Sequence, residues 1–309
     1  MGKFSLLRIG MLMRLLALLF MFACVANAQN CDINNDWFLA KHLNNVSDTP
    51  VRFAPDIVST KAIEFNTSMS KDGKAFYFAS ASSDWSQSFA KVSHFIDGKW
   101  STPQRVEYEG NIDLGSDIHI TYNGEQFFKA YMGDIYRSDK QGAHWGKPQK
   151  LSSAINTESY ESYAIITCSG NLYFQRRIDK VNWDLYVAHF KSGSYQQAQR
   201  LPSHINSDIM EADAYIPPDE SFMIFIRMRA TDGLGLSDLY ISYNEKGQWS
   251  EPVNMGKKVN SKGVDGSPFV SPDRQFLFFT SNRHSKDVEK FDGELDIYVR
   301  RIDINQWRK

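Results

Sequence analysis

The chain has few of the residues and segments on which several protein classes depend. Its 309 residues include only 3 cysteines and 10 prolines, which excludes a disulfide-dense miniprotein and a collagen-like chain. A hydrophobic content of 42% excludes a disordered chain. The formal net charge of -1 gives no electrostatic basis for a nucleic-acid partner or an anionic membrane. We therefore expect a globular protein that does not bind nucleic acid.

Sequence motifs for the common catalytic chemistries are also missing. The chain has no Gly-x-Ser-x-Gly nucleophile elbow, His-Glu-x-x-His zinc helix, phosphate-binding loop or dinucleotide fingerprint. Its 7 histidines are scattered singly, which argues against a histidine metal site. We expect no resident cofactor, apart from calcium or another cation that a group of acidic side chains could hold.

Long hydrophobic runs are absent except near the N-terminus. Residues 15–25 form an apolar run that follows Lys3, Arg8 and Arg14 and precedes the small residues at 26–28. The run is shorter than the roughly 20 residues that a membrane span needs. This pattern predicts a signal peptide at residues 1–28 and a periplasmic or secreted protein without a transmembrane segment. The alternative is a lipoprotein anchored at Cys24. Cleavage removes three basic residues and changes the net charge from -1 to -4.

The predicted mature chain retains two cysteines, Cys31 and Cys168. In an oxidising compartment, this pair could form one disulfide that ties the N-terminal tail at residues 29–47 to the body. The alternative is two unrelated thiols. The sequence leaves both interpretations open.

The chain contains a fivefold internal repeat. Tight-turn signals recur at spacings of 46 to 54 residues, each followed by a run of aromatic and branched residues: Asp72-Gly73, Asn123-Gly124, Ser169-Gly170, Asp219-Glu220 and Asp273-Arg274. An Asp-Ile-Tyr or Asp-Leu-Tyr triplet follows in four units. A further aromatic residue follows in each unit, at Trp100, Trp145, Tyr195, Trp249 and Trp307.

Each repeat has room for four strands and contains no helix-periodic run. Four strands per 40–50 residues are typical of a β-propeller blade. We therefore predict an all-β chain in which residues 48–309 form one domain, a five-bladed β-propeller with four-stranded antiparallel blades.

The two ends of this domain predict how the ring closes. The last unit stops at Trp307, before the outermost strand, whereas residues 49–53 match residues 102–106 of the first unit. We expect residues 48–54 to form the outermost strand of the last blade by antiparallel pairing, which removes an exposed sheet edge.

The repeat resembles a known family. Ser271-Pro272-Asp273, Ser281-Asn282-Arg283 and Asp296-Ile297-Tyr298 are similar to the Pro-Asp (WD-like) repeats of TolB-like β-propellers. The similarity extends over residues 48–309. It implies the propeller fold, and its motifs say little about function.

Acidic residues recur eight positions before the turn signals. Four of the five units have Glu or Asp there, and Asp117 lies close to this position in the other unit. This position begins the innermost strand of a blade, so the acids should surround one mouth of the channel. The residues expected to contact ligand at this mouth are Glu64, Asp117, Glu161, Glu211, Asp265, Arg177, Arg229 and Arg283. The alternative is structural: the acids accept backbone N–H groups or pair with Arg176, Arg227 and Arg283.

Two functions remain open. The first is a non-catalytic binding or scaffold propeller that takes a peptide, a protein partner or an envelope glycan at the channel mouth. The second is a carbohydrate-active enzyme, because five-bladed propellers resemble the scaffold of several glycosidase families. Such an enzyme needs two carboxylates, and the pair expected for it is Glu161 and Glu211. A deep pocket with one isolated carboxylate pair would favour the enzyme, and carboxylates occupied by backbone amides would favour the scaffold.

Overall fold

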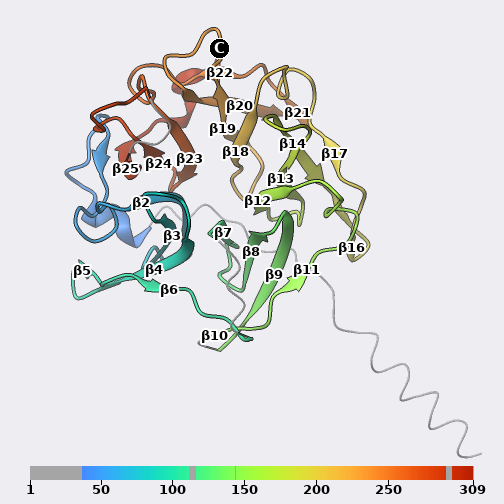
Figure 1. Cartoon of the computed structure of the whole chain (residues 1–309), viewed down its shortest axis with the longest axis horizontal. Helices are drawn as coiled ribbons and strands as arrows, with labels where there is room; N and C mark the ends of the chain where they lie inside the picture. The colour runs from blue at the N-terminus through green and yellow to red at the C-terminus, as the bar shows by residue number, and fades with distance from the viewer. Residues whose placement is uncertain (1–36, 111–115, 143, 290–293, 309) are drawn as a thin grey trace, which may run out of the picture.

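A computed structural model describes residues 37–110, 116–142, 144–289 and 294–308 of the chain. These residues form an all-β structure in which five small antiparallel sheets surround a central axis (Figure 1). The described part also contains two short 3-10 helices, η1 (Phe38–His42) and η2 (Ile304–Trp307). None of its helices has the length and apolar character of a membrane span. The predicted five-bladed propeller is confirmed.

Each blade is a meander in which the first strand lies next to the axis and the last is a two-residue strand paired with the third. Blade 1 consists of β2 (Ile63–Met69), β3 (Ala75–Ala81), β4 (Ser88–Ile96), β5 (Lys99–Trp100) and β6 (Gln104–Arg105). Blade 2 consists of β7 (Ile118–Ile120), β8 (Gln126–Tyr131), β9 (Asp134–Gln141), β10 (His144–Trp145) and β11 (Gln149–Lys150). Blade 3 consists of β12 (Glu161–Ile166), β13 (Leu172–Arg177), β14 (Trp183–Ala188) and β17 (Gln199–Arg200), with the hairpin β15 (Phe190–Lys191) and β16 (Ser194–Tyr195). Blade 4 consists of β18 (Glu211–Tyr215), β19 (Phe222–Met228), β20 (Ser237–Glu245), β21 (Gln248–Trp249) and β22 (Val253–Asn254). Blade 5 consists of β23 (Asp265–Val270), β24 (Phe276–Ser281), β25 (Asp296–Arg301) and β1 (Val51–Arg52).

The recurrent turn signals lie between the first and second strands of the blades. In blade 1, the Asp72 carboxylate accepts hydrogen bonds from the hydroxyl of Ser70 and the backbone N–H of Lys74. Gly73 follows with a φ of 72°, a conformation that costs glycine little. The Ser271 hydroxyl and the Gln275 N–H bond to Asp273 in the same way in blade 5. The same hydrogen bonds to an aspartate carboxylate therefore stabilise the turn before the second strand in both the first and the last blade.

Asparagine side chains link adjacent blades at three crossovers. The side-chain oxygen of Asn156 accepts the N–H of Ile135 in β9 at 2.7 Å, and its amide donates back to the Ile135 carbonyl at 3.0 Å. Asn206 and Asn260 make the same two bonds to Leu185 in β14 and Leu239 in β20. Each asparagine side chain thus pairs with the third strand of the preceding blade as a backbone residue of a neighbouring strand would. This pairing fixes the position at which the next blade begins.

The predicted ring closure is confirmed. β1 pairs antiparallel with β25, with Val51 opposite Val299 and Arg52 opposite Tyr298. The N–H of Phe53 continues the ladder by donating to the carbonyl of Ile297 at 2.8 Å. The Phe53 ring is 3% exposed and lies 4.6 Å from the ring of Phe76 in blade 1, centroid to centroid. The closing segment therefore joins the last blade by backbone bonds and the first by aromatic packing.

Segments at both chain ends pack on the ring. Trp37 and Leu39, in the predicted N-terminal tail, are buried in the largest hydrophobic core cluster. The Trp37 ring lies 6.2 Å from the ring of Phe276 in blade 5. At the other end, Trp307 belongs to η2, and its indole N–H donates to the carbonyl of Met255 at 3.1 Å. The last aromatic repeat position is therefore helical in blade 5, whereas Trp100, Trp145, Tyr195 and Trp249 lie in short strands.

Truncation of the Phe53 side chain tests the closure energetically. We expect Phe53→Ala to lower the free energy of unfolding by about 3–5 kcal/mol, because it leaves a cavity between the first and last blades. Val51 lies on the same short strand but is 44% exposed. Val51→Ala should therefore change the free energy of unfolding by less than about 0.5 kcal/mol. Urea unfolding measures both variants, and equal losses would contradict the closure as described.

Candidate functional site

The recurrent acids are buried at the starts of the first strands. The side chain of Glu161 is 0% exposed. Its carboxylate accepts the backbone N–H of Thr157 at 3.1 Å and the hydroxyl of the same residue at 2.6 Å. Arg176, which is opposite Glu161 in the β12–β13 ladder, donates from Nε at 2.7 Å. The carboxylate therefore ties the crossover loop to the first two strands of its blade.

Blades 4 and 5 repeat this arrangement. Glu211 accepts the N–H and hydroxyl of Ser207 and pairs with Arg227 at 3.1 Å. Asp265 accepts the N–H and hydroxyl of Ser261 and pairs with Arg283 at 2.7 Å. The side chains of Glu211 and Asp265 are also 0% exposed. The geometry favours the structural alternative for these acids and arginines, including Glu161 and Glu211, which the sequence had suggested as a catalytic pair.

Glu64 is the blade 1 member of the series and lacks a facing arginine. Thr60 donates its N–H and hydroxyl to the carboxylate at 3.0 and 2.6 Å, but the residue opposite Glu64 in β3 is Ser80. Burial raises the pKa of Glu64 to about 7, and the charge of Asp296 adds to the shift, while the bonds from Thr60 oppose it. Glu64 therefore takes up a proton near neutral pH.

A β-bulge follows two residues after each acid. The ladder register shifts within the first strand of blades 1, 3, 4 and 5. The bulged residues have the left-handed conformation, with φ between 45° and 52°: Asn66, Tyr163, Asp213 and Ser267. Asp117 occupies the same offset in blade 2. A bulge redirects a side chain, and here it turns these positions toward the channel. We call Asn66, Asp117, Tyr163, Asp213 and Ser267 the bulge ring.

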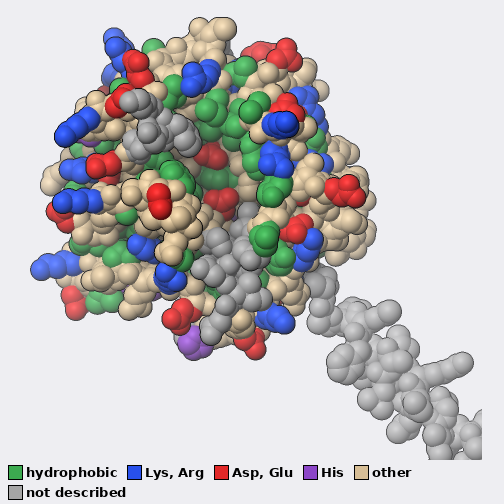
Figure 2. Space-filling model, viewed as in Figure 1, with side chains coloured by type: hydrophobic (Ala, Val, Ile, Leu, Met, Phe, Trp, Pro, Cys, Tyr) green, Lys and Arg blue, Asp and Glu red, His purple; other side chains and the backbone are tan. Residues whose placement is uncertain are grey.

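Most of the bulge ring lines a cavity at the channel mouth that carries the acids. The cavity measures about 490 Å³, and its wall includes four members of the ring, Asp117, Tyr163, Asp213 and Ser267. Large apolar side chains complete the wall: Phe65, Trp85, Trp183, Met210 and Met228. Figure 2 shows a central hollow in this face, with acidic and hydrophobic side chains at its wall. Its size and mixed lining match those of small-ligand sites.

The two aspartates of the bulge ring influence one another. Asp213 Oδ2 accepts the N–H of Ser267 at 3.2 Å and its hydroxyl at 3.0 Å. Burial raises the pKa of Asp213 to about 6, the charge of Asp117 raises it further, and the bonds from Ser267 oppose the shift. Asn66 donates its side-chain amide to Asp117 at 3.5 Å. The cavity therefore combines two interacting carboxylates, one of which is protonated in mildly acidic solution.

The remaining predicted ligand residues lie outside this cavity. The Arg177 guanidinium stacks 4.0 Å from the centroid of the Tyr160 ring. Arg229 is exposed in the loop after β19, where its N–H donates to the carbonyl of Leu236. Within the described residues, no three His, Cys, Asp or Glu side chains form a metal-binding group. The described residues therefore contain no group of this kind that could hold the predicted calcium or other cation.

Several sequence-based expectations fall on undescribed residues. Residues 1–28, with the predicted signal peptide and the alternative anchor at Cys24, lie outside the described part of the chain. Cys168 is disulfide-bonded. Its predicted partner, Cys31, also lies outside the described residues, so this pairing stays a prediction.

Comparison with known proteins supports the fold. No family model and no curated protein sequence matches the chain. Among solved structures, the catalytic domain of a GH62 α-L-arabinofuranosidase from Coprinopsis cinerea is 8% identical, and the match covers 83% of this chain and 98% of that one at a TM-score of 0.54. A TolB from Agrobacterium tumefaciens is 16% identical over 79% of this chain and 92% of that one at a TM-score of 0.50.

A TolB from Acinetobacter baumannii is 13% identical over 77% of this chain at a TM-score of 0.46, and the match spans only 56% of the length of that TolB. The match to the Agrobacterium tumefaciens protein supports the TolB-like propeller fold predicted from the repeats. The same fold similarity extends to glycoside hydrolases, so it does not distinguish a binding protein from an enzyme.

The buried acid–arginine pairs give the first prediction about this site. We expect Glu161→Gln to lower the free energy of unfolding by about 3 kcal/mol or more, because it leaves the charge of Arg176 without a counter-ion. The Arg176 side chain is only 13% exposed, so water cannot fully replace the carboxylate. Glu64→Gln is the matched control, since no arginine faces Glu64. Urea unfolding at pH 7 compares the two, and an equal loss would contradict the role assigned to the arginine.

The raised pKa of Glu64 predicts a pH dependence. Its folded-state pKa of about 7 lies above the ordinary value of 4.5, so the folded protein binds more protons between these two values. This contribution to stability is present at low pH and is lost as the pH rises through 7. We expect the wild-type protein to lose stability between pH 5 and about pH 8 relative to Glu64→Gln. Parallel unfolding profiles of the two proteins would contradict the assignment.

Proposed function

We propose that this protein is an exported binding propeller that takes a carbohydrate, such as a segment of an envelope glycan, into the cavity at the acid-bearing channel mouth. One observation carries the proposal: Asp117 and Asp213 share a cavity of about 490 Å³ with the aromatic side chains Phe65, Trp85 and Trp183. The expected signal peptide at residues 1–28 supports export, and the TolB-like fold is compatible with a periplasmic or secreted protein.

The lining of this cavity suits the chemistry of a sugar. Sugar hydroxyls donate hydrogen bonds, which the carboxylates of Asp117 and Asp213 accept. The apolar faces of a sugar ring pack on flat aromatic surfaces. The Phe65 and Trp85 rings lie 5.4 Å apart at an angle of 48°, which gives the wall an aromatic corner. A basic peptide or protein segment would use the same carboxylates but would gain less from the aromatic wall.

The position of the cavity residues favours specific binding. Asp213 belongs to β18 of blade 4, and Gln175 belongs to β13 of blade 3. Gln175 Oε1 accepts the N–H of Asp213 at 2.8 Å, so the two strands fix each other across the blade boundary. Ser267 fixes the Asp213 carboxylate from the other side. Such preorganised polar groups lose little entropy when a ligand binds.

A second candidate is a carbohydrate-active enzyme that uses the same cavity. The observation that favours it is the raised pKa of Asp213, about 6, beside a second carboxylate. Glycoside hydrolysis requires one protonated and one ionised carboxyl group, and neighbouring environments commonly separate their pKa values. In this alternative, Asp213 is the general acid and Asp117 the base or nucleophile. The buried pair Glu161 and Glu211 would keep a structural role.

Asp213→Asn tests the proposed binding site. The probes are arabinan, xylan and peptidoglycan oligosaccharides on an array, followed by calorimetry with the one that binds best. We expect Asp213→Asn to weaken this binding by about 10-fold or more, because a charged hydrogen-bond acceptor is lost. Wild-type affinity should fall as the pH drops through 6 and Asp213 becomes protonated, whereas the variant should lose this dependence.

The wild-type protein, the Asp213→Asn variant and the same oligosaccharide probes also distinguish the two candidate functions. Arg229→Ala, which changes an exposed residue outside the cavity, should bind like the wild type. Retention of the probe without release of reducing sugar supports the binding protein. Release of sugar that Asp213→Asn abolishes supports the enzyme. Binding of basic peptides with no binding of any glycan would contradict the proposed ligand class.

A further inference from the structure

Most of the exposed large hydrophobic side chains of the described residues lie on one face of the propeller. Because the first strand of each blade starts at the acid-bearing mouth and its neighbours are antiparallel, the hairpins between second and third strands lie on that face. Six of the eight side chains of this kind are there, five in these hairpins and one just before β12: Trp85, Met132, Tyr160, Ile178, Val181 and Leu234. We call these six residues the apolar rim. Figure 2 shows hydrophobic side chains gathered around the hollow of this face.

The apolar rim is continuous across blades 2 and 3. Gly133, next to Met132, packs so closely on Tyr160 that a Cβ there would come within 2.7 Å of the ring. Arg177 donates its N–H to the Tyr160 carbonyl at 2.8 Å, and the hairpin that follows carries Val181. The Met132 and Val181 side chains are 77% and 67% exposed. Two neighbouring blades therefore present one apolar surface beside the mouth.

The charged residues of the blade 3 hairpin differ in where their charge is directed. The Asp179 carboxylate turns back on its own hairpin and accepts the N–H groups of Val181 and Asn182, both at 2.8 Å. Lys180 is exposed and forms no ion pair with a described residue. It lies between Ile178 and Val181 in the sequence. The outward charge at this apolar tip is therefore positive, a local feature that the net charge of the chain does not reveal.

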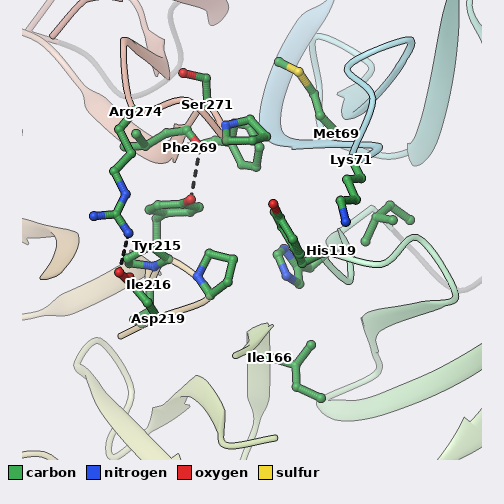
Figure 3. Close-up of a pocket in the computed structure, with 16 residues that line it drawn as sticks. Met69, Lys71, His119, Ile166, Tyr215, Ile216, Asp219, Phe269, Ser271 and Arg274 are labelled. Carbon is green, nitrogen blue, oxygen red and sulfur yellow. Dashed lines mark hydrogen bonds and ion pairs between the residues drawn. The ribbon is translucent and has the colours of Figure 1, made fainter. Parts of the chain in front are cut away.

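The opposite end of the channel is built differently. Its pocket measures about 50 Å³ and has a mainly apolar lining. Figure 3 shows Arg274 paired with Asp219 at this pocket. In the same view, the Tyr215 hydroxyl donates to the Val270 carbonyl at 3.0 Å. None of the described residues that line this pocket is an exposed large hydrophobic residue, so the apolar rim marks only the mouth that opens into the larger cavity.

The form of the apolar rim indicates the kind of partner. Contiguous apolar patches are uncommon on the free surface of a soluble monomer and mark contact sites. The rim consists of separate hairpin tips around a mouth, which can all enter one flat apolar layer but cannot share one groove-filling segment. A lipid surface is such a layer: aliphatic tips enter the acyl boundary, and tryptophan and tyrosine favour the interfacial region. A lysine beside the tips contacts anionic headgroups.

We infer that the apolar rim docks this protein on an anionic phospholipid surface, with Met132 and Val181 inserted, Lys180 against the headgroups and the acid-bearing mouth facing the lipid. Docking does not depend on the identity of the ligand in the cavity. Together with the proposed carbohydrate site, it names the ligand class, a glycan carried on a lipid of that surface, because such a headgroup is what the mouth meets. This second step rests on the proposed function.

Co-sedimentation with vesicles tests the docking. The full-length exported protein is mixed with vesicles of phosphatidylglycerol and phosphatidylcholine in equal parts, and we expect the wild type to sediment with them. Val181→Asp should weaken this binding by about 10-fold or more, because a charge replaces an apolar side chain that enters the lipid. Ile96→Asp is the matched control: Ile96 is 59% exposed but ends β4 at the opposite end of the channel, so this variant should bind like the wild type.

Several results of this experiment would overturn the docking. Wild-type protein that stays in the supernatant would do so, as would equal affinities of Val181→Asp and Ile96→Asp. A dimer in sedimentation velocity that Val181→Asp abolishes, with no vesicle binding, would assign the rim to a second copy of the chain instead. Lys180→Ala should weaken binding to the mixed vesicles by about 5-fold and binding to pure phosphatidylcholine by less. Equal losses on the two compositions would overturn the headgroup contact.

Vesicles that carry a glycan test the ligand class. The probe is the oligosaccharide that binds best on the array, coupled to a lipid anchor in the same vesicles. We expect it to tighten wild-type binding by about 10-fold or more, and Asp213→Asn should remove this gain while binding to plain vesicles is unchanged. Binding of the soluble oligosaccharide without binding of any vesicle would overturn the docking and leave the proposed function intact. Binding of plain vesicles without binding of any glycan would contradict the proposed function and leave the docking intact.

Discussion

A buried carboxylate at the start of the innermost strand is the interaction on which this ring depends. In blades 3, 4 and 5, the carboxylate accepts two hydrogen bonds from a Thr or Ser four residues earlier and pairs with an arginine from the neighbouring strand or the loop after it. The residue before this Thr or Ser is an asparagine that bonds the third strand of the preceding blade. One short segment therefore connects two blades and fixes the starting position of the next.

This constraint also places the candidate site. In blades 3, 4 and 5 the acid is the first residue of the strand, and the bulge falls two residues later, at a position that lines the channel. The side chain at the bulge is then free to differ from blade to blade, as the bulge ring does. The scaffold thus repeats, whereas the chemistry at the centre of the channel does not. A ligand site on a propeller needs this combination of a rigid frame and variable inward positions.

The turn chemistry, the aromatic repeats and the match between residues 49–53 and 102–106 were enough to predict the five blades and their closure. These signals are local in the sequence, and each corresponds to one turn or one strand in the structure. The role of the acids was not decided by the sequence, because the register that places Arg176 beside Glu161 appears only when strands pair. The helical position of Trp307 depends likewise on how the chain end packs on Met255.

Most of the bulge ring cannot be predicted from the sequence, for a related reason. The sequence pattern singles out Asp117 only as a substitute acid and does not single out Asp213, although both lie two residues after the repeated acid position. That constant offset was visible in the sequence, but its significance requires knowing that the strand bulges there. The cavity itself joins residues from Phe65 to Leu295, so no local pattern contains it.

The most direct test of this account is a crystal structure of the protein soaked with the oligosaccharide that it binds best. We expect a sugar ring in the acid-bearing mouth, with its hydroxyls bonded to Asp117 and Asp213 and one face against the wall formed by Phe65, Trp85 and Trp183. A sugar bound at the blade edges or at the opposite end of the channel, with this cavity empty, would contradict it.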